Sequence, residues 1–123
     1  MNQVLIVEDN MDLRHCYMQV VNLCGCSAIP AENGQQALEL LRRPSFHPKL
    51  VILDLMMPVM DGWTFLSERA KDPALNKVPV VVCSAAADRL PEGIRFMRKP
   101  ISVDMLLSPH LSDAIFGIFA SGN

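Results

Sequence analysis

Three short segments made up only of apolar residues constrain the fold of this 123-residue chain more than any other feature. They are residues 4–7 (VLIV), 50–53 (LVIL) and 80–83 (VVVC). A strand with one face in water alternates apolar and polar side chains, whereas a strand covered on both faces is apolar throughout. The three segments therefore predict buried strands of a parallel sheet with helices on both faces.

The intervals between these segments have the three- and four-residue apolar spacing of amphipathic helices. The spacing predicts helices over residues 11–25, 34–43 and 62–71, the first with Asn10 as its N-cap and Gly25 at its end. Residues 27–30 predict a brief edge strand, because Pro30 would be poorly tolerated in a central one. With residues 94–98 as the last strand, the alternation predicts a five-stranded, doubly wound α/β fold.

Composition narrows the class of protein. Hydrophobic residues make up 50% and charged residues 20% of the chain, which suits one globular domain over residues 1–123. The net charge of -2 gives no basic face, so we expect no direct binding of nucleic acid. Without a membrane-length apolar run or a signal-peptide pattern, we expect a cytoplasmic protein that does not insert into membranes. The four cysteines lack zinc-site spacing and are expected to be reduced thiols.

Polar side chains follow four of the predicted strands. In strand order these residues are Glu8 and Asp9, then Asp54, then Ser84, then Lys99. Parallel strands end at one edge of a sheet, and open α/β sheets bind their ligands at that edge. We therefore expect the five side chains to line one cleft, with Asp54 as the first residue of its segment to emerge from the core.

Three carboxylates, a hydroxyl and an ammonium group in one cleft favour phosphoryl chemistry. The carboxylates of Glu8, Asp9 and Asp54 would repel one another, and a hard cation such as Mg²⁺ relieves that repulsion while keeping water and phosphate ligands. A carboxylate can attack phosphorus to give an aspartyl phosphate. Ser84 and Lys99 are suitable for positioning the phosphoryl oxygens and neutralising their charge.

Four motifs in this order resemble the receiver domain of two-component response regulators. The motifs are VLIVEDN, VILDLMMPVMDGW, VVVCSA and FMRKP, and the resemblance runs from about residue 3 to residue 107. It implies a flavodoxin-like sheet of strand order 2-1-3-4-5. It also implies that Asp54 accepts a phosphoryl group from a sensor histidine kinase or a phosphotransfer protein, and that the change reaches a downstream protein that the sequence does not identify.

The resemblance also implies individual roles at the site. Asp9, Asp54 and the Met56 backbone carbonyl would bind Mg²⁺, and Glu8 would assist through water. Beyond its own phosphoryl transfer and autodephosphorylation, a receiver catalyses nothing, so the resemblance implies that the chain is not an enzyme.

Three further residues match positions that respond to phosphorylation in the family. Ser84 takes the position of the switch hydroxyl, Lys99 that of the phosphoryl-binding lysine, and Phe96 that of the switch aromatic. Because Phe96 has no hydroxyl, any switch at this position would work by packing.

The chain departs from the family between its last two strands. Only the nine residues 85–93 (AAADRLPEG) lie between Ser84 and the segment 94–98, which leaves room for about two helical turns at most. We therefore expect a shortened or missing fourth helix and an altered signalling surface. Residues 108–123 keep a helical apolar stripe across Pro109, which predicts either a kinked last helix or a C-terminal helical extension.

Two other functions stay open at this point. One is a phosphatase with an aspartate nucleophile, as in haloacid-dehalogenase-like folds. Such enzymes place a second aspartate two residues after the nucleophile as general acid. This chain has Met56 there, which cannot act as an acid and therefore argues against this function. A pseudo-receiver, an interaction module that is never phosphorylated, is the main alternative because the fourth-helix region is short.

Overall fold

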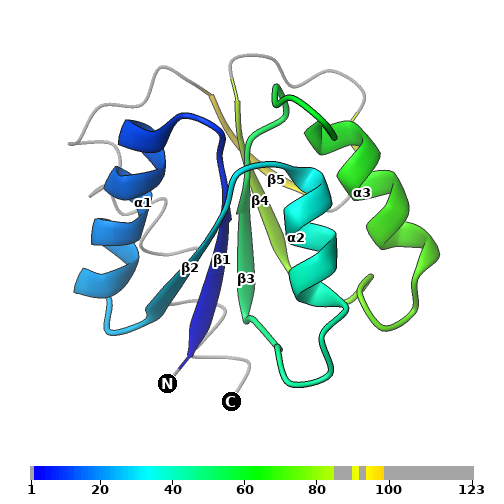
Figure 1. The fold of residues 1–123 in the computed structure, drawn as a ribbon, viewed down its shortest axis with the longest axis horizontal. Coiled ribbons are helices and arrows are strands. Elements are labelled where there is room, and N and C mark those ends of the chain that lie inside the picture. Colours follow the sequence, from blue (N-terminus) through cyan, green and yellow to red (C-terminus); the bar gives the residue numbers. More distant parts are fainter. Residues whose placement is uncertain (1, 85–89, 92–93, 99–123) are drawn as a thin grey trace.

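The structure, a computed structural model, describes residues 2–84, 90–91 and 94–98 of the chain. In this part the chain forms one parallel sheet of order β2-β1-β3-β4-β5 (Figure 1). The strands are β1 (Gln3–Val7), β2 (Ser27–Ala31), β3 (Leu50–Leu53), β4 (Val80–Ser84) and β5 (Arg95–Arg98). The helices are α1 (Met11–Leu23), α2 (Gly34–Leu41) and α3 (Gly62–Lys71). The predicted strand order and doubly wound architecture are confirmed.

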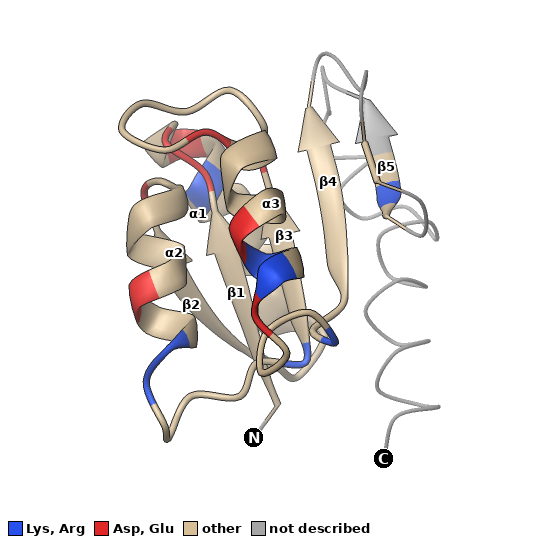
Figure 2. Ribbon diagram, turned by 90° about the vertical axis from the view of Figure 1, so that its right-hand side faces the viewer, with Lys and Arg blue, Asp and Glu red and all other residues tan. Residues whose placement is uncertain are grey.

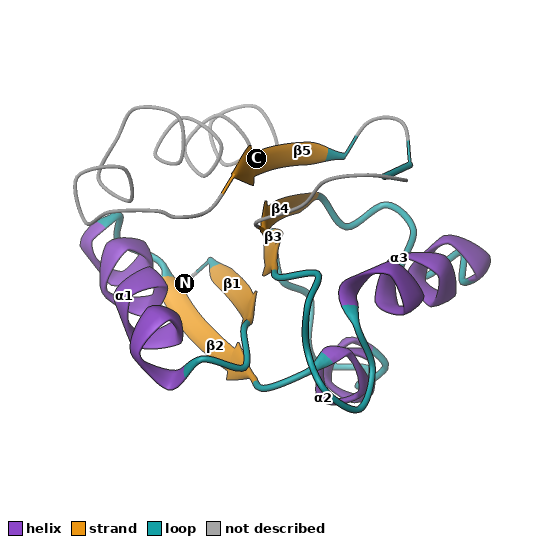
Figure 3. Ribbon diagram, turned by 90° about the horizontal axis from the view of Figure 1, so that it is seen from above, coloured by secondary structure: helices purple, strands orange, loops and turns teal. Residues whose placement is uncertain are grey.

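Helices cover both faces of the sheet, which explains why its central strands are apolar throughout. Figure 3 shows α1 on one side of the sheet and α2 and α3 on the other. Alternate strand residues enter two separate cores: Ile6 and Ile52 pack on the side of α1, and Leu5 and Leu53 on the side of α2 and α3. All four residues of β3 are buried, as the apolar run predicted.

Each helix begins at a polar N-cap. The Asn10 side chain accepts a hydrogen bond from the Leu13 N–H at 2.9 Å, which confirms the predicted cap of α1. Asn33 caps α2 in the same way, and Asp61 caps α3 by accepting from the Thr64 N–H at 2.8 Å. The sequence analysis assigned no role to Asp61, and the structure shows that it caps α3. A cap of this kind contributes about 1 kcal/mol.

Element boundaries differ from the predicted ones by one or two residues. Ser84 is the last residue of β4 rather than the residue after it, and α2 ends at Leu41 with Arg42 as its C-cap. At the end of α1, Gly25 has φ +80°, a conformation that glycine adopts without strain. This confirms the predicted stop.

The region between β4 and β5 is described only in part. Leu90, Pro91 and Ile94 have no regular secondary structure, and the described part of the chain holds three helices, which fits a shortened fourth helix. Lys99 and the predicted C-terminal helix over residues 108–123 lie outside the described residues. No helix in the described part is long and apolar enough to cross a membrane.

Candidate functional site

Glu8, Asp9 and Asp54 form an acidic cluster at the carboxyl edge of the sheet. One oxygen of each carboxylate lies within 4.8 Å of an oxygen of the other two. Sheet register produces this approach, because Val7 pairs with Leu53 and the two strands end side by side. The sequence predicted that acids after β1 and β3 would meet at this edge, and the structure brings these three together.

Backbone hydrogen bonds hold the first residue after each strand in the line of the sheet. The Glu8 N–H donates to the Ala31 carbonyl at 3.1 Å, and the Asp54 N–H donates to the Val7 carbonyl at 3.0 Å. The strand geometry therefore continues one residue beyond β1 and β3. The positions of the Glu8 and Asp54 side chains follow from the sheet itself and not from a loop.

Asp54 is more deeply buried than the sequence indicated. We expected it to emerge from the core, but only 4% of its surface is exposed. The next residue, Leu55, is fully buried, and the Gly62 N–H donates to its carbonyl at 2.9 Å, which holds the backbone that follows Asp54 in place. Burial weakens the solvation of a carboxylate, so Asp54 needs a positive partner when it is charged.

Gly62 is required for this close packing. A Cβ atom at this position would lie 2.6 Å from the Asp54 carbonyl oxygen and 2.7 Å from the Leu55 Cα atom. Both neighbours are backbone atoms that cannot move without moving Asp54. The glycine therefore fixes how close the first turn of α3 comes to the acidic cluster.

Arg14 supports the loop that carries Glu8 and Asp9, and the sequence analysis did not identify it. Its guanidinium donates to the Glu8 carbonyl oxygen at 2.8 Å and reaches the Asp9 carbonyl oxygen at 3.5 Å. Only 9% of the residue is exposed. The sequence held one signal for this role: Arg14 is a charged residue at a position that, with Tyr17 three residues later, falls on the buried stripe of α1.

Ser84 places a buried hydroxyl at the end of β4. The residue is fully buried, and its Oγ atom makes no hydrogen bond within the described residues. Val82 pairs with Leu53, so Ser84 at the end of β4 lies beyond the level of Asp54 on the neighbouring strand. An unsatisfied buried hydroxyl costs about 1–3 kcal/mol, and such groups call for a bound species that completes their hydrogen bonds.

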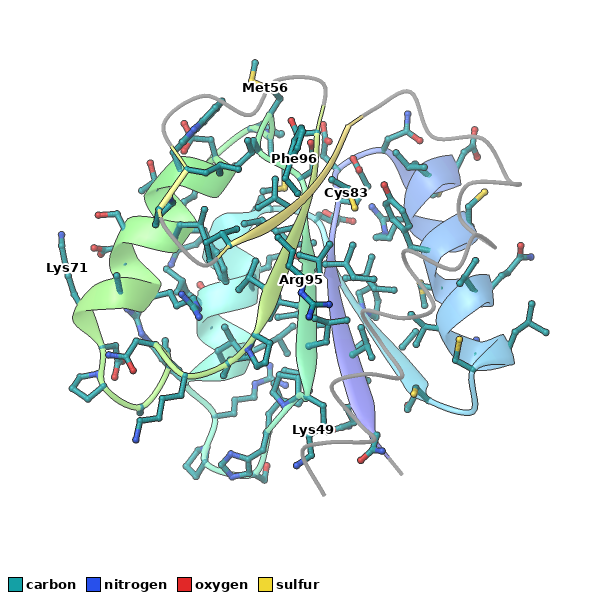
Figure 4. All side chains as sticks on the ribbon, turned by 180° about the vertical axis from the view of Figure 1, so that it is seen from behind. Lys49, Met56, Lys71, Cys83, Arg95 and Phe96 are labelled. Atoms are coloured by element: carbon teal, nitrogen blue, oxygen red, sulfur yellow. The ribbon has the colours of Figure 1, made fainter. Side chains whose placement is uncertain are left out.

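Of the remaining predicted site residues, Phe96 and Met56 lie in the described part of the chain and Lys99 does not. Phe96 lies on β5 beside Val82 of β4 and packs against the core on the α2 and α3 side, while Met56 is 62% exposed at the top of the molecule (Figure 4). The role predicted for Met56 belongs to its backbone carbonyl and stays a prediction. Lys99 follows β5 outside the described residues, so its predicted approach to Asp54 also stays a prediction.

The acidic cluster suits a hard divalent cation. Oxygen ligands of octahedral Mg²⁺ stand about 2.1 Å from the metal, and therefore up to about 4.2 Å from one another. Cluster oxygens within 4.8 Å of one another reach that spacing through small side-chain rotations. The donor set, which is all oxygen, is also the one that Mg²⁺ prefers.

Charge is distributed unevenly along the strands. Figure 2 shows acidic segments at the edge where β1 ends, while Lys and Arg segments occupy the opposite edge, after α2 and before β3 and β4. The carboxylates of Glu8, Asp9 and Asp54 gather at the first of these edges, where a bound cation would offset their charge.

Comparisons with known proteins agree with this geometry. A family model described as the response regulator receiver domain matches residues 4–108. The chain is 39% identical over 108 residues to the sensor histidine kinase TmoS of Ectopseudomonas mendocina, covering 87% of this chain and 10% of that protein. It is 33% identical over 86 residues to the probable transcriptional regulator ycf27 of Porphyridium aerugineum, covering 70% of this chain and 34% of that protein.

A solved structure gives the same picture. The signal receiver domain of a signal transduction histidine kinase from Syntrophus aciditrophicus superposes with a TM-score of 0.79 at 26% identity, over 95% of this chain and 92% of that one. The chain spans about a third of the length of the first curated relatives that it matches.

Proposed function

Because this chain belongs to the response regulator receiver domain family, we propose that it is a phosphorylation-dependent signalling switch with Asp54 as its phosphoacceptor. One observation carries the assignment of the residue: Asp54 is buried at the end of a central strand, and its carboxylate lies within 4.8 Å of those of Glu8 and Asp9. We propose further that residues 1–123 make up a single receiver domain.

In the proposed reaction an Asp54 carboxylate oxygen attacks the phosphorus atom of a phosphohistidine. The new P–O bond forms as the P–N bond breaks, and the imidazole leaves with the electron pair of that bond and takes up a proton. Backbone pairing of Asp54 with Val7 holds the attacking carboxylate at a fixed place on the sheet edge. The protein contributes mainly position and charge, as in other phosphoryl transfers.

Asp9 and Asp54 would hold Mg²⁺ together with the Met56 carbonyl, and Glu8 would assist through water. When bound, the ion supplies positive charge that offsets both the carboxylates and the phosphoryl oxygens. Asp9 is the exposed member of the cluster, whereas Glu8 and Asp54 are buried. Asp9 therefore faces the side from which an ion and a phosphodonor would enter.

After transfer, the Ser84 hydroxyl and the Lys99 ammonium group would bind the phosphoryl oxygens. The Oγ of Ser84 is fully buried and has no hydrogen-bond partner among the described residues, which supports this role because a phosphoryl oxygen would supply the missing acceptor. Movement of Ser84 at the end of β4 would be transmitted to Phe96 on the paired strand β5. The signal would then pass to a partner protein through the surface next to β5.

The proposed phosphodonor is a sensor histidine kinase or a phosphotransfer protein. The similarity to TmoS, which is named a sensor histidine kinase, supports this class of partner. The proposed output is an altered protein-interaction surface, without direct contact to nucleic acid. The only catalysis that this proposal assigns to the chain is its own phosphoryl transfer and autodephosphorylation.

Phosphorylation by acetyl phosphate with Mg²⁺ tests the assignment. We expect the wild-type chain to acquire one hydroxylamine-sensitive phosphoryl group by intact mass, and Asp54→Asn to acquire none. Asp61→Asn is a matched control, because asparagine also caps helices and Asp61 lies outside the cluster. Labelling of Asp54→Asn at the wild-type level would overturn the assignment, and an unlabelled wild-type chain would favour the pseudo-receiver.

A further inference from the structure

Tyr17 places a hydroxyl in the apolar core between α1 and the sheet. It is the only tyrosine of the chain, and 1% of its surface is exposed. It packs in the core cluster on the α1 side together with Ile6, Ile52 and Cys83. A phenylalanine would fill this core equally well, so the hydroxyl itself needs an explanation.

The pleat of the sheet puts the acidic cluster on the same side as Tyr17. Side chains two residues apart on a strand point to the same face, so Glu8 follows Ile6 and Asp54 follows Ile52. The backbone pairing of Glu8 and Asp54 keeps this alternation in force one residue past each strand. Both carboxylates therefore leave the sheet on the face that α1 covers, the face against which Tyr17 packs.

The hydroxyl of Tyr17 has little else to bind. The Cys83 thiol on β4 lies against it and is only a weak hydrogen-bond partner. Within the described residues, no nitrogen or oxygen atom forms a hydrogen bond with this hydroxyl. Among the charged groups of the described residues, Glu8 and Asp54 are the ones whose fields act on it.

The phenol keeps its proton in this setting. Burial, the Cys83 thiol and the negative charges of Glu8 and Asp54 together raise the pKa of Tyr17 above its ordinary value of 10.0. A neutral phenol is a hydrogen-bond donor, and carboxylates are its strongest acceptors.

We propose that Tyr17 is a positioning residue of the acidic cluster, whose hydroxyl donates its one hydrogen bond to a carboxylate oxygen of either Glu8 or Asp54, from the core side, when a divalent cation is bound. The cation occupies carboxylate lone pairs on the open side of the cluster, and Tyr17 satisfies one on the buried side. Groups that orient metal ligands in this way alter metal affinity without touching the metal. The inference rests on the cation site of the proposed function.

The single tyrosine makes a direct test possible. With [¹³Cζ]-tyrosine incorporated into the 123-residue chain, the protein gives one tyrosine resonance, whose shift reports hydrogen bonding of the phenol. We expect this resonance to move during a Mg²⁺ titration, with the same Kd that calorimetry gives. In Asp9→Asn, which changes only the exposed acid of the cluster, we expect the movement to be lost.

Tyr17→Phe removes the hydroxyl and keeps the ring. We expect the Kd for Mg²⁺ to rise about tenfold, while the Tm of the metal-free protein stays level or rises because an unsatisfied hydroxyl has gone. Val20→Ala is the matched control: it lies in the same core cluster on the same helix and carries no polar atom. It should lower the Tm and leave the Kd unchanged.

A Tyr17→Phe protein that binds Mg²⁺ as tightly as the wild type, or a tyrosine resonance that stays still while calorimetry records binding, would overturn the inference and leave the proposed function standing. A wild-type chain that binds no Mg²⁺ by calorimetry would overturn the proposed cation site, and the role of Tyr17 with it. The two failures are therefore distinguishable.

Discussion

Several residues at and near the acidic cluster lower the folding stability of the metal-free protein. Asp54 and Glu8 are buried carboxylates beside a third acid, and Ser84 holds a buried hydroxyl with no partner among the described residues. The three carboxylates repel one another, and the unsatisfied Ser84 hydroxyl lacks the hydrogen bonds that it would make in water. Their presence at one edge of the sheet is typical of a binding site, where a ligand completes the interactions.

Removing one cluster charge should therefore stabilise the metal-free protein. Asp54→Asn keeps the size of the side chain and removes repulsion that amounts to roughly 1–3 kcal/mol for charges at this separation. We expect chemical denaturation without Mg²⁺ to show a gain in unfolding free energy of that order. The stabilisation of the wild type by added Mg²⁺ should be lost in the variant. A variant less stable than the wild type would contradict the view that the acids repel one another.

Tyr17 predicts how stability depends on pH in the alkaline range. The pKa of this phenol is raised in the folded protein, so above pH 10 the unfolded chain loses a proton that the folded chain keeps. Stability from this group is complete below pH 10 and falls above it by up to about 1.4 kcal/mol per pH unit. Guanidinium unfolding between pH 8 and 11 should show this decline, and Tyr17→Phe should show a shallower one. Equal slopes would count against the buried phenol as its cause.

Gly62 tests how closely α3 must approach Asp54. In Gly62→Ala the new methyl group meets backbone atoms of Asp54 and Leu55 at under 3 Å, so the first turn of α3 has to move. The shift should cost about 1–3 kcal/mol in spite of the better helix propensity of alanine. Thermal unfolding measures the loss, with the exposed substitution Thr64→Ala in the same helix as control. A stabilised Gly62→Ala protein would mean that the contact relaxes freely.

At the scale of elements, α1 acts as a support for the cluster as well as a cover for the sheet. Its N-cap Asn10 fixes where the helix begins, and Arg14 ties the first turns of the helix to the loop after β1. The loop that carries Glu8 and Asp9 is therefore held at both ends, by β1 and by Arg14. A loop held in this way loses little entropy on binding a cation.

Arg14→Met should loosen this loop. The variant keeps an apolar stem in the core but leaves the Glu8 carbonyl oxygen without its partner at 2.8 Å. We expect a loss of about 1–3 kcal/mol in unfolding free energy, together with a higher Kd for Mg²⁺ in calorimetry. Arg42→Met, at the exposed C-cap of α2, should change neither quantity appreciably. An unchanged Kd in Arg14→Met would assign Arg14 to stability alone.

At the scale of the whole molecule, the sequence predicted the architecture well because periodicity and strand-end polarity are global signals. The apolar run 50–53 corresponds residue for residue to β3, and Pro30 lies in an edge strand as predicted. The meeting of acids from β1 and β3 followed from parallel order alone. None of these inferences needed the position of any individual side chain.

What the sequence could not supply are contacts that depend on the exact path of the backbone. Arg14 resembles a surface charge until the Glu8 carbonyl is seen to lie beside it. Asp61 resembles a solvated acid until the first turn of α3 is located. The close approach of Gly62 to the backbone of Asp54 and Leu55 is a contact that no periodicity encodes.

The place of Pro30 in β2 has a consequence for how copies of this protein behave beside one another. The Ser27 N–H donates to the Asn2 carbonyl and the Ala31 carbonyl accepts from the Glu8 N–H, so the backbone groups of residues 27 and 31 face β1. Because alternate residues of a strand face opposite neighbours, the nitrogen of Pro30 points away from β1. Proline has no N–H, so it removes a hydrogen-bond donor from the exposed edge of β2 and leaves the hydrogen bonds between β2 and β1 intact. A strand of a second molecule that paired with this edge would lack one backbone hydrogen bond at Pro30. This disfavours edge-to-edge aggregation in concentrated solution.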